Sequence, residues 1–228
     1  MSLVLYQHPL ASFCHKVLIA LYENGTPFEN RIVDLSDESS RADLFRFWPI
    51  GKMPLLRDEA RDSTIPETSI IIEYLEQYYP GPLRLLPLEI DRALQVRLWD
   101  RFFDHYVQAP MQTLVSNLRR PEGTADEIEV TAAKATLATA YSMIEKQLAD
   151  KPWISGDSFT MADCAAAPAL FYAAIVQPFG NDQPYLASYR DRLLARPSVK
   201  RVIAEARPYF EMFPYRDAMP ERYLKDNA

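Results

Sequence analysis

Two patterns of hydrophobic and polar residues divide the chain near Pro80. Before Pro80, short apolar or alternating runs that are typical of strands are separated by stretches with helical spacing. "LVLYQ" predicts a buried strand, "FCHKVLIALYENG" a helix that ends at Asn24-Gly25, and "FENRIVDL" a second strand. A hairpin formed by "KMPLLRDEA" and the segment before Ile65 precedes a helix over "ETSIIIEYLEQYY". This order predicts a small α/β domain over residues 1–80.

After Pro80 almost only the helical spacing remains. A linker over residues 81–89 leads to a long helical run, "EIDRALQVRLWDRFFDHYVQAPMQTLVSNLRR", which Pro110 should kink or divide. A second long helix covers "TADEIEVTAAKATLATAYSMIEKQLAD", and "FTMADCAAAPALFYAAIVQPF" is apolar on nearly all sides, which predicts a central buried helix. Two shorter helices divided near Arg196-Pro197 and a polar tail, "PERYLKDNA", that we expect to be loose complete an all-helical domain over residues 90–228.

Composition narrows the class of protein. Of the 228 residues 48% are hydrophobic and 25% are charged, as in ordinary globular proteins. A net charge of −6 argues against a nucleic-acid-binding protein, which normally carries a basic stripe. No apolar run is long enough to cross a membrane, and the N-terminus lacks the features of a signal peptide, so we expect a cytoplasmic protein that binds no membrane.

The sequence shows no pattern typical of several other kinds of structural or catalytic site. Cys14 and Cys164 are the two cysteines, which excludes a disulfide framework. The three histidines are scattered and have few acidic or thiol companions, so no metal site is expected. A Ser-His-Asp arrangement and a glycine-rich phosphate loop are also missing.

Three stretches resemble segments of the cytosolic glutathione S-transferase family, and the resemblance covers essentially the whole chain in order. They are "GKMPLL" (51–56), "PETSIIIEYLE" (66–76) and "GDSFTMADCAAAP" (156–168). The resemblance implies a thioredoxin-like α/β domain that binds glutathione, followed by an all-α domain that contributes the acceptor-substrate site. It also implies a transferase of the bacterial serine- or cysteine-like type, with glutathione as co-substrate, no metal, and a homodimeric assembly.

The same resemblance assigns the glutathione-binding residues. In the family the proline of the first segment is cis and the preceding residue pairs its backbone with the cysteinyl residue, which here points to Met53 and Pro54. Glu67 and Thr68 would hold the ammonium and carboxylate of the γ-glutamyl group, and Lys52 would meet a ligand carboxylate. The residues alone also fit a proline that ends a strand, a solvated lysine, and an acid with a threonine cap at a helix start.

The residue that activates the thiol is harder to assign. Counting back from "CHKV", the family's activating position falls on Ala11, which cannot donate a hydrogen bond. Moving a thiol pKa from about 8.5 to about 6.5 requires roughly 2.7 kcal/mol of preference for the anion. A helix N-terminus supplies about 0.3–1 kcal/mol, and a hydrogen bond to a charged group about 1.5–3 kcal/mol. A donor must therefore join the helix, and Ser12 is the first candidate, through its hydroxyl or a nearby backbone N–H.

Other residues compete with Ser12. Cys14 could form a mixed disulfide with glutathione, as in a glutathione-dependent disulfide or peroxide reductase, or it could pack in the core. Tyr6 is more often a core residue than a catalytic one, and Lys16 is expected to be solvated. Ala11 also keeps open a third function, a non-catalytic binding module with this fold.

The helical domain should supply the second half of the site. Pockets at domain junctions are lined by apolar and aromatic side chains, and from the many such residues we expect Tyr106 and Met111 to line the acceptor site. Their bulk indicates an apolar or aromatic electrophile. Thr160 and Asp163 form a capping box at the start of the central helix, in which Cys164 is expected to be buried and unreactive.

Overall fold

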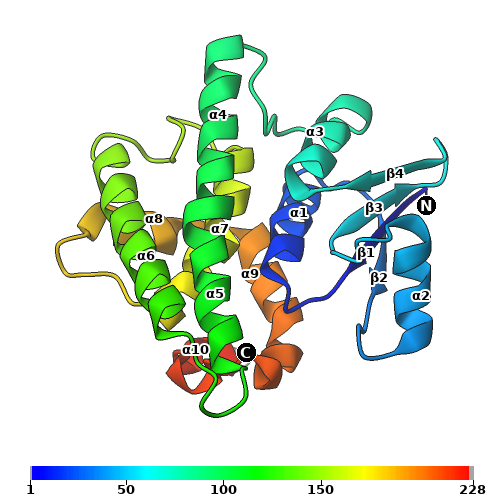
Figure 1. Ribbon diagram of the computed structural model, residues 1–228. Helices are drawn as coiled ribbons and strands as arrows, with labels where there is room; N and C mark the ends of the chain where they lie inside the picture. Colours follow the sequence, from blue (N-terminus) through cyan, green and yellow to red (C-terminus); the bar gives the residue numbers. More distant parts are fainter. Residues whose placement is uncertain (1, 226–228) are drawn as a thin grey trace.

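A four-stranded sheet lies at one side of the molecule and helices fill the other (Figure 1). The computed structural model describes residues 2–225. The first part contains β1 (Leu3–Gln7), α1 (Ser12–Glu23), β2 (Glu29–Ile32), α2 (Glu38–Phe47), β3 (Leu55–Asp58), β4 (Ser63–Pro66) and α3 (Thr68–Tyr78). The strand order is β2-β1-β3-β4, with β1 and β2 parallel and the other two pairs antiparallel. The predicted small α/β domain is therefore confirmed.

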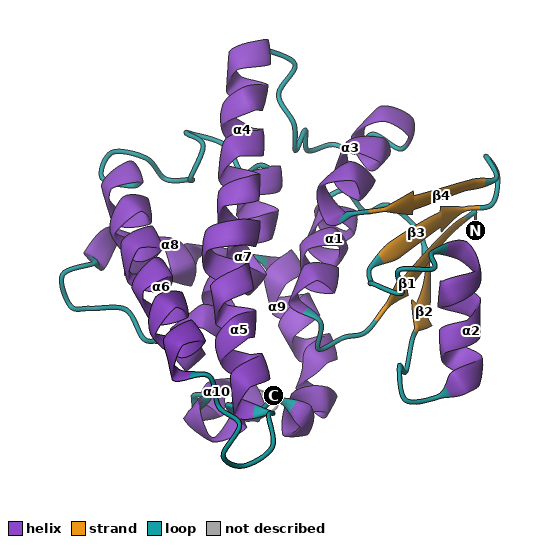
Figure 2. Ribbon diagram, in the orientation of Figure 1, coloured by secondary structure: helices purple, strands orange, loops and turns teal. Residues whose placement is uncertain are grey.

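Alternation along β1 sorts its side chains onto two faces of the sheet, because successive side chains of a strand point to opposite sides. Leu3 and Leu5 pack in the large core with residues of α1 and α3. Val4 and Tyr6 pack in a smaller cluster with Leu44 of α2. Helices α1 and α3 thus cover one face of the sheet and α2 covers the other (Figure 2).

Helix α2 was not predicted from the sequence. Its residues, "ESSRADLFRF", are mostly polar, and Leu44 is the one that is buried. Local bonds start the helix instead, since the Asp37 carboxylate accepts a hydrogen bond from the N–H of Ser39 at 3.0 Å.

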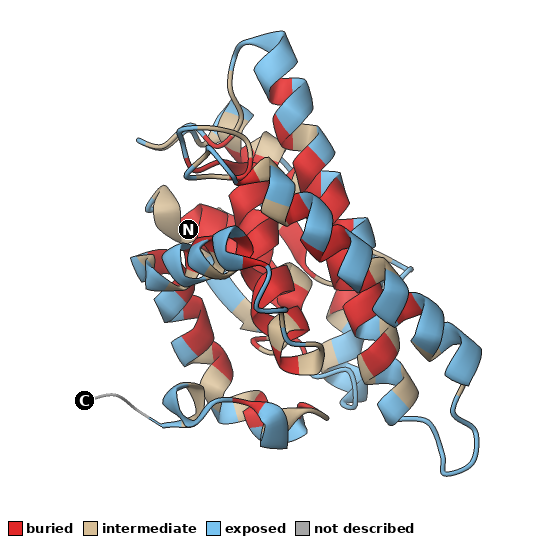
Figure 3. Cartoon of the chain, turned by 90° about the vertical axis from the view of Figure 1, so that its left-hand side faces the viewer, coloured by how far each residue is buried: buried red, intermediate tan, exposed pale blue. Residues whose placement is uncertain are grey.

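The second part is entirely helical (Figure 2). It contains α4 (Ile90–Phe102), η1 (Phe103–Gln108), α5 (Ala109–Leu118), α6 (Glu127–Gln147), α7 (Met161–Val176), α8 (Pro184–Ala195), α9 (Pro197–Ala206), η2 (Arg207–Met212), η3 (Arg216–Ala218) and α10 (Glu221–Leu224). Helix α7 is buried along nearly its whole length, as its apolar sequence predicted (Figure 3). The predicted division at Arg196-Pro197 is also confirmed. The tail is less loose than expected because α10 forms there, and residues 226–228 of that prediction lie outside the described chain.

The expected disturbance around Pro110 takes the form of a π-helical turn. Helices α4 and α5 form one column with η1, a π-helix, between them (Figure 1). Pro110 has no N–H to donate to the carbonyl of Tyr106, and its ring would crowd that carbonyl in a regular α-helix. The wider turn accommodates the proline without breaking the column.

The capping box of α7 forms as predicted. One oxygen of Asp163 accepts hydrogen bonds from the backbone N–H of Thr160 at 2.8 Å and from its hydroxyl at 3.0 Å. The other oxygen accepts from the N–H of Ile154 at 3.2 Å and from the hydroxyl of Tyr189 at 2.5 Å. Cys164 is fully buried, and burial raises the pKa of its thiol well above the usual value.

The two parts share one hydrophobic core. The buried cluster runs without interruption from Leu3 in β1 through α1 and α7 to Met219 near the C-terminus. Polar contacts join the same parts, including Arg196 to Glu23 at 2.8 Å and the Tyr22 hydroxyl to Glu205 at 2.8 Å. The sheet part and the helical part therefore pack against each other through a common core. Within residues 2–225, no helix is long and apolar enough to cross a membrane.

Candidate active site

Three loops meet at one end of the sheet. Leu55, the first residue of β3, lies opposite Tyr6 of β1 and opposite Pro66 of β4. The residues just before Leu55 therefore lie beside the segment that leaves β1 and beside the start of α3. This register brings Met53-Pro54, His8 and Glu67 to a common edge.

The peptide bond between Met53 and Pro54 is cis, as the resemblance implied. Pro54 is buried, while Met53 is partly exposed and lines the cleft. The N–H and C=O of Met53 make no backbone hydrogen bond within residues 2–225, so both are open to an extended ligand. Lys52, next to it, is exposed to solvent.

Glu67 has an unusual backbone conformation, with φ at +69°. Such a left-handed conformation costs a non-glycine residue about 1–3 kcal/mol and is concentrated at functional sites. Glu67 is exposed and occupies the N-cap position of α3, and Thr68 is the first helical residue. The interpretation of Thr68 as a side-chain cap is thus wrong, because no side chain caps this helix. The first N–H groups of α3 therefore donate to no capping side chain, and Thr68 itself is only 6% exposed.

A buried ionic cluster contacts Ser69 in the first turn of α3. The hydroxyl of Ser69 donates to Asp100 at 2.5 Å, and the ammonium of Lys16 lies 2.7 Å from Asp100 and 2.8 Å from Asp104. The expectation of a solvated Lys16 is wrong, because its side chain is 1% exposed. Burial lowers the pKa of Lys16, while Asp100 acts in the opposite direction. The sequence does not reveal this cluster, because its residues come from separate helices and meet only when α1, α3 and α4 pack together.

The loop before α1 is held by four hydrogen bonds. Within the loop, the N–H of Ala11 donates to the carbonyl of His8 at 2.9 Å, and the N–H of Leu10 donates to Nδ1 of His8 at 3.2 Å. From α7, the hydroxyl of Tyr172 donates to the carbonyl of Leu10 at 3.3 Å. His15 Nε2 donates to the carbonyl of Pro9. Burial lowers the pKa of His15 to about 4, so the ring is neutral at pH 7.

Ser12 and Cys14 are both buried, at 6% and 0% exposed, but Ser12 lines the cleft and Cys14 does not. Ser12 is the first residue of α1 and lines the cleft, and its Oγ accepts a hydrogen bond from Nε2 of Gln108 in η1. Cys14 is fully buried, and burial raises the pKa of its thiol to about 12. A reactive cysteine requires the reverse, an accessible thiol of lowered pKa. Tyr6 is buried on the α2 side of the sheet, where its hydroxyl accepts from Arg31 at 3.0 Å.

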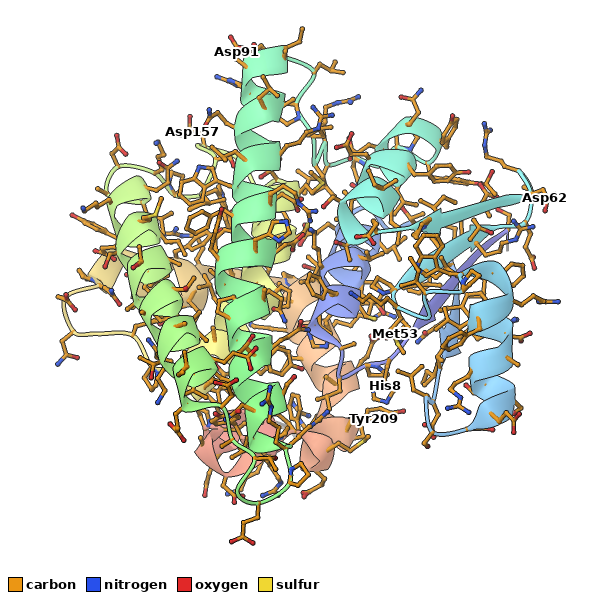
Figure 4. The ribbon with its side chains drawn as sticks, viewed as in Figure 1. His8, Met53, Asp62, Asp91, Asp157 and Tyr209 are labelled. Carbon is orange, nitrogen blue, oxygen red and sulfur yellow. The ribbon has the colours of Figure 1, made fainter. Side chains whose placement is uncertain are left out.

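A cleft of about 650 Å³ opens between the two parts, and its walls are mainly apolar. The sheet side contributes Leu10, Ser12 and Met53, and the helical side contributes Met111, Val115, Tyr172, Met212 and Phe213. In Figure 4, His8, Met53 and Tyr209 gather where the strands face the helices, and the rings of His8 and Tyr209 are 4.9 Å apart. A ligand in this cleft would contact both parts of the chain.

The cleft separates the two residues predicted for the acceptor site. Met111 lines the cleft, whereas Tyr106 is 53% exposed, packs on Phe102, and is not among the lining residues. The π turn shifts the helical register between Tyr106 and Met111, and a shift of this kind cannot be read from the spacing of apolar residues. Val115 could have been found, since it follows Met111 by four residues on the same helical face. Met212 and Phe213 carried no signal, because they follow the last regular helical pattern.

No three His, Cys, Asp or Glu side chains among the described residues are grouped as a metal site would require. The site combines the backbone of Met53, the hydroxyl-bearing residues Ser12 and Thr68, the exposed Lys52 and Glu67, and a cleft whose walls are mainly apolar.

Two family models match the chain. The N-terminal domain of glutathione S-transferases matches residues 5–83, and the C-terminal domain matches residues 102–197. The chain belongs to the glutathione S-transferase family. Both models follow the division between the sheet part and the helical part, and the fold is that of this family.

The relatives of this family member include proteins named as glutathione S-transferases and a protein named as a stringent starvation protein. Glutathione S-transferase GstB of Escherichia coli is 27% identical over 190 residues, which cover 82% of this chain and 91% of the relative. The stringent starvation protein A homolog of Haemophilus influenzae is 28% identical over 202 residues, covering 86% and 87%. A solved glutathione S-transferase of Methylobacterium radiotolerans, in complex with glutathione sulfonate, has 28% identity and a TM-score of 0.76, covering 88% and 93%.

Proposed function

We propose that this family member is a glutathione transferase that binds glutathione along the end of the sheet and activates its thiol at the start of α1. The observation that carries the proposal is the strand register that brings the cis Met53-Pro54 loop beside Glu67, together with the interdomain cleft that Met53 and Ser12 line. The names of GstB and of the solved Methylobacterium enzyme support the same activity.

Glutathione binds in an extended conformation in this proposal. The unpaired backbone of Met53 forms two hydrogen bonds with the cysteinyl residue, and the buried Pro54 fixes the direction of that loop. The exposed carboxylate of Glu67 accepts from the γ-glutamyl ammonium, and the Thr68 hydroxyl with the first N–H groups of α3 holds the γ-glutamyl carboxylate. Lys52 lies exposed beside Met53 and pairs with the remaining carboxylate.

Ser12 stabilises the thiolate. Ser12 lines the cleft at the N-terminus of α1, where the helix dipole contributes about 0.3–1 kcal/mol to an anion. A hydroxyl hydrogen bond to the sulfur adds about 1.5–3 kcal/mol. Together these effects are sufficient for a shift of about two pKa units, which is roughly 2.7 kcal/mol. The thiol proton leaves to solvent, and the thiolate attacks the electrophile without a covalent enzyme intermediate.

The acceptor is an apolar or aromatic electrophile. Met111, Val115 and Phe213 form an apolar wall across the cleft from Met53, and such walls favour ligands of the same character. A homodimer is part of the proposal, because Ile70 of α3 and Leu94 and Leu98 of α4 are more than half exposed. Light scattering on the purified protein measures the mass of the assembly, and a monomer would contradict this part alone.

The test begins with retention on immobilised glutathione and continues with a thiolate absorbance titration of the complex. We expect retention, a bound-thiol pKa below the free value of about 8.5, and a return toward that value in Ser12→Ala. Glu67→Gln should lose retention, because the ammonium of glutathione loses its charged partner. Failure to bind glutathione at millimolar concentration would contradict the proposal as a whole.

A binding module without catalytic activity is the second candidate. Ala11 at the family's activating position favours it, as does the similarity to a protein named for stringent starvation. Retention on glutathione together with an unchanged thiol pKa would identify such a module. The reductase that would use Cys14 has no comparable support, because the thiol is buried and its pKa is raised.

A further inference from the structure

Gln108 is a buried polar residue that the glutathione-binding motifs leave without a role. It lies at the end of the π turn η1, and it is only 2% exposed. Its amide nitrogen Nε2 donates a hydrogen bond to Oγ of Ser12, across the boundary between the two parts of the chain. Ser12 is among the residues that line the cleft and Gln108 is not, and the hydrogen bond between them is buried.

The direction of this hydrogen bond determines what Ser12 can do. A serine hydroxyl carries one hydrogen and two acceptor lone pairs. When a buried amide N–H occupies a lone pair, the hydroxyl acts as the acceptor in that bond and its own hydrogen is left for another partner. The open partner position is the cleft, where the sulfur of glutathione would lie.

We propose that Gln108 is a positioning residue that orients the hydroxyl hydrogen of Ser12 toward the sulfur of glutathione. The proposal rests on the function proposed above, since it requires Ser12 to be the group that stabilises the thiolate. Gln108 touches neither glutathione nor the electrophile; it acts through Ser12. The reacting proton is still that of the thiol, which goes to solvent.

A second contact fixes the register in which Gln108 meets Ser12. Ser12 and Lys16 are four residues apart on α1, and therefore lie on one face of that helix. Their partners, Gln108 and Asp104, are also four residues apart, and both lie within the π turn. The ammonium of Lys16 lies 2.8 Å from Asp104 and is almost completely buried. The Lys16–Asp104 ion pair and the Gln108–Ser12 hydrogen bond thus connect α1 to η1 at two places.

The π turn contributes to this arrangement. A π-helix closes its hydrogen bonds over five residues instead of four, so side chains four residues apart lie closer to one line than in an α-helix. The turn precedes Pro110, which disfavours regular α-helical bonding at this place. The proline that disturbs the column therefore helps to bring Gln108 opposite Ser12. π turns are frequent at functional sites.

The test is a mutant cycle between Ser12→Ala and Gln108→Met, which keeps the length of the side chain and removes its N–H donor. The bound-thiol pKa is measured by thiolate absorbance, and kcat/KM with chlorodinitrobenzene is measured against pH. Affinity for S-methylglutathione, which has no thiol, reports whether the binding site is intact. Gln77→Met, at an exposed position on α3, is the matched control.

We expect Gln108→Met to lower kcat/KM at pH 7 about three- to tenfold and to raise the thiol pKa, since one neutral hydrogen bond orients the donor. Affinity for S-methylglutathione should change less than about twofold, because the γ-glutamyl and backbone contacts are untouched. In the Ser12→Ala background, Gln108→Met should have no further effect. Gln77→Met should behave as the parent protein.

Three results would overturn the inference. The first is a thiol pKa and pH profile that Gln108→Met leaves unchanged while Ser12→Ala raises the pKa; the proposed function would then stand without Gln108. The second is an equal effect of Gln108→Met with and without the Ser12 hydroxyl, which would mean a purely structural role. The third is an unchanged thiol pKa in Ser12→Ala itself, which would remove Ser12 activation and Gln108 positioning together.

An isosteric variant covers the case in which Gln108→Met does not fold. Gln108→Glu has the same shape, but its carboxylate accepts the Ser12 hydrogen and withdraws it from the sulfur. We expect a larger rise of the thiol pKa than in Gln108→Met. The new charge also repels a thiolate directly, and the same variant in the Ser12→Ala background measures that contribution. If Gln108→Glu raises the pKa equally in both backgrounds, the inference fails.

Discussion

Replacing His15 with glutamine should make the protein less sensitive to acid. His15 is fully buried, and its Nε2 donates to the carbonyl of Pro9 in the loop before Ser12. A glutamine side chain can place an N–H donor near the same carbonyl, but it does not titrate. The comparison therefore separates the protonation of the imidazole from the loss of its hydrogen bond.

The magnitude follows from the pKa of His15 in the two states. Burial lowers this pKa to about 4 in the folded protein, against the ordinary histidine value of 6.5 in the unfolded chain. Below pH 6.5 the unfolded chain binds a proton that the folded protein does not, so the free energy of unfolding falls as the pH falls. The stability contribution is complete above pH 6.5 and is lost progressively toward pH 4. A difference of about 2.5 units corresponds to about 3 kcal/mol.

The assay is urea unfolding at pH 7, 5.5 and 4 and at one protein concentration, with the parent protein and His15→Gln side by side. All other titrating groups are common to both, so the difference between the two curves isolates His15. The parent should lose about 3 kcal/mol more than the variant between pH 7 and pH 4. Parallel curves, or an NMR titration of the His15 ring with a pKa above 6, would refute the reasoning.

Three further predictions follow from the same packing. Cys14→Ser should keep the transferase activity and the bound-thiol pKa of the parent, and native protein should resist alkylation at Cys14; rapid alkylation would contradict its burial. Asp163→Ala should lower the free energy of unfolding by about 3–5 kcal/mol, because it strips partners from two N–H groups and a buried tyrosine hydroxyl, whereas Thr160→Ala should cost about 1 kcal/mol; equal losses by urea unfolding would refute this. Met111→Ala should raise KM for chlorodinitrobenzene severalfold and leave the affinity for S-methylglutathione unchanged in calorimetry, whereas weaker binding of both would place Met111 elsewhere.

The elements that are buried along nearly their whole length were predictable from the sequence. β1 and the buried α7 bury most of their residues, so hydrophobic burial alone specifies them. α2 escaped prediction because one buried leucine and a capping aspartate define it. The α10 helix near the end of the chain is only four residues long, which is too short for a periodic pattern.

The candidate site was predictable only where local sequence defines it. The cis bond at Met53-Pro54 and the position of Glu67-Thr68 come from short motifs, which the structure places at one sheet edge. The contact between Gln108 and Ser12 joins residues 96 positions apart. It depends on the angle at which the column of α4, η1 and α5 packs against α1. That angle is set by tertiary packing and cannot be read from any local stretch of sequence. Tyr106 was misplaced for the same reason, because the π turn changes which side chains face inward.

The continuous core described above affects how the two halves could be exchanged between relatives. Val17, Leu18 and Leu21 of α1 lie in the same cluster as residues of α7, so an isolated N-terminal half would expose these side chains to water. We expect the chain to unfold in a single cooperative transition. A chimera with the helical half of another family member would therefore also need the α1 of that protein. Otherwise the side chains in the contact between α1 and α7 would have to be redesigned.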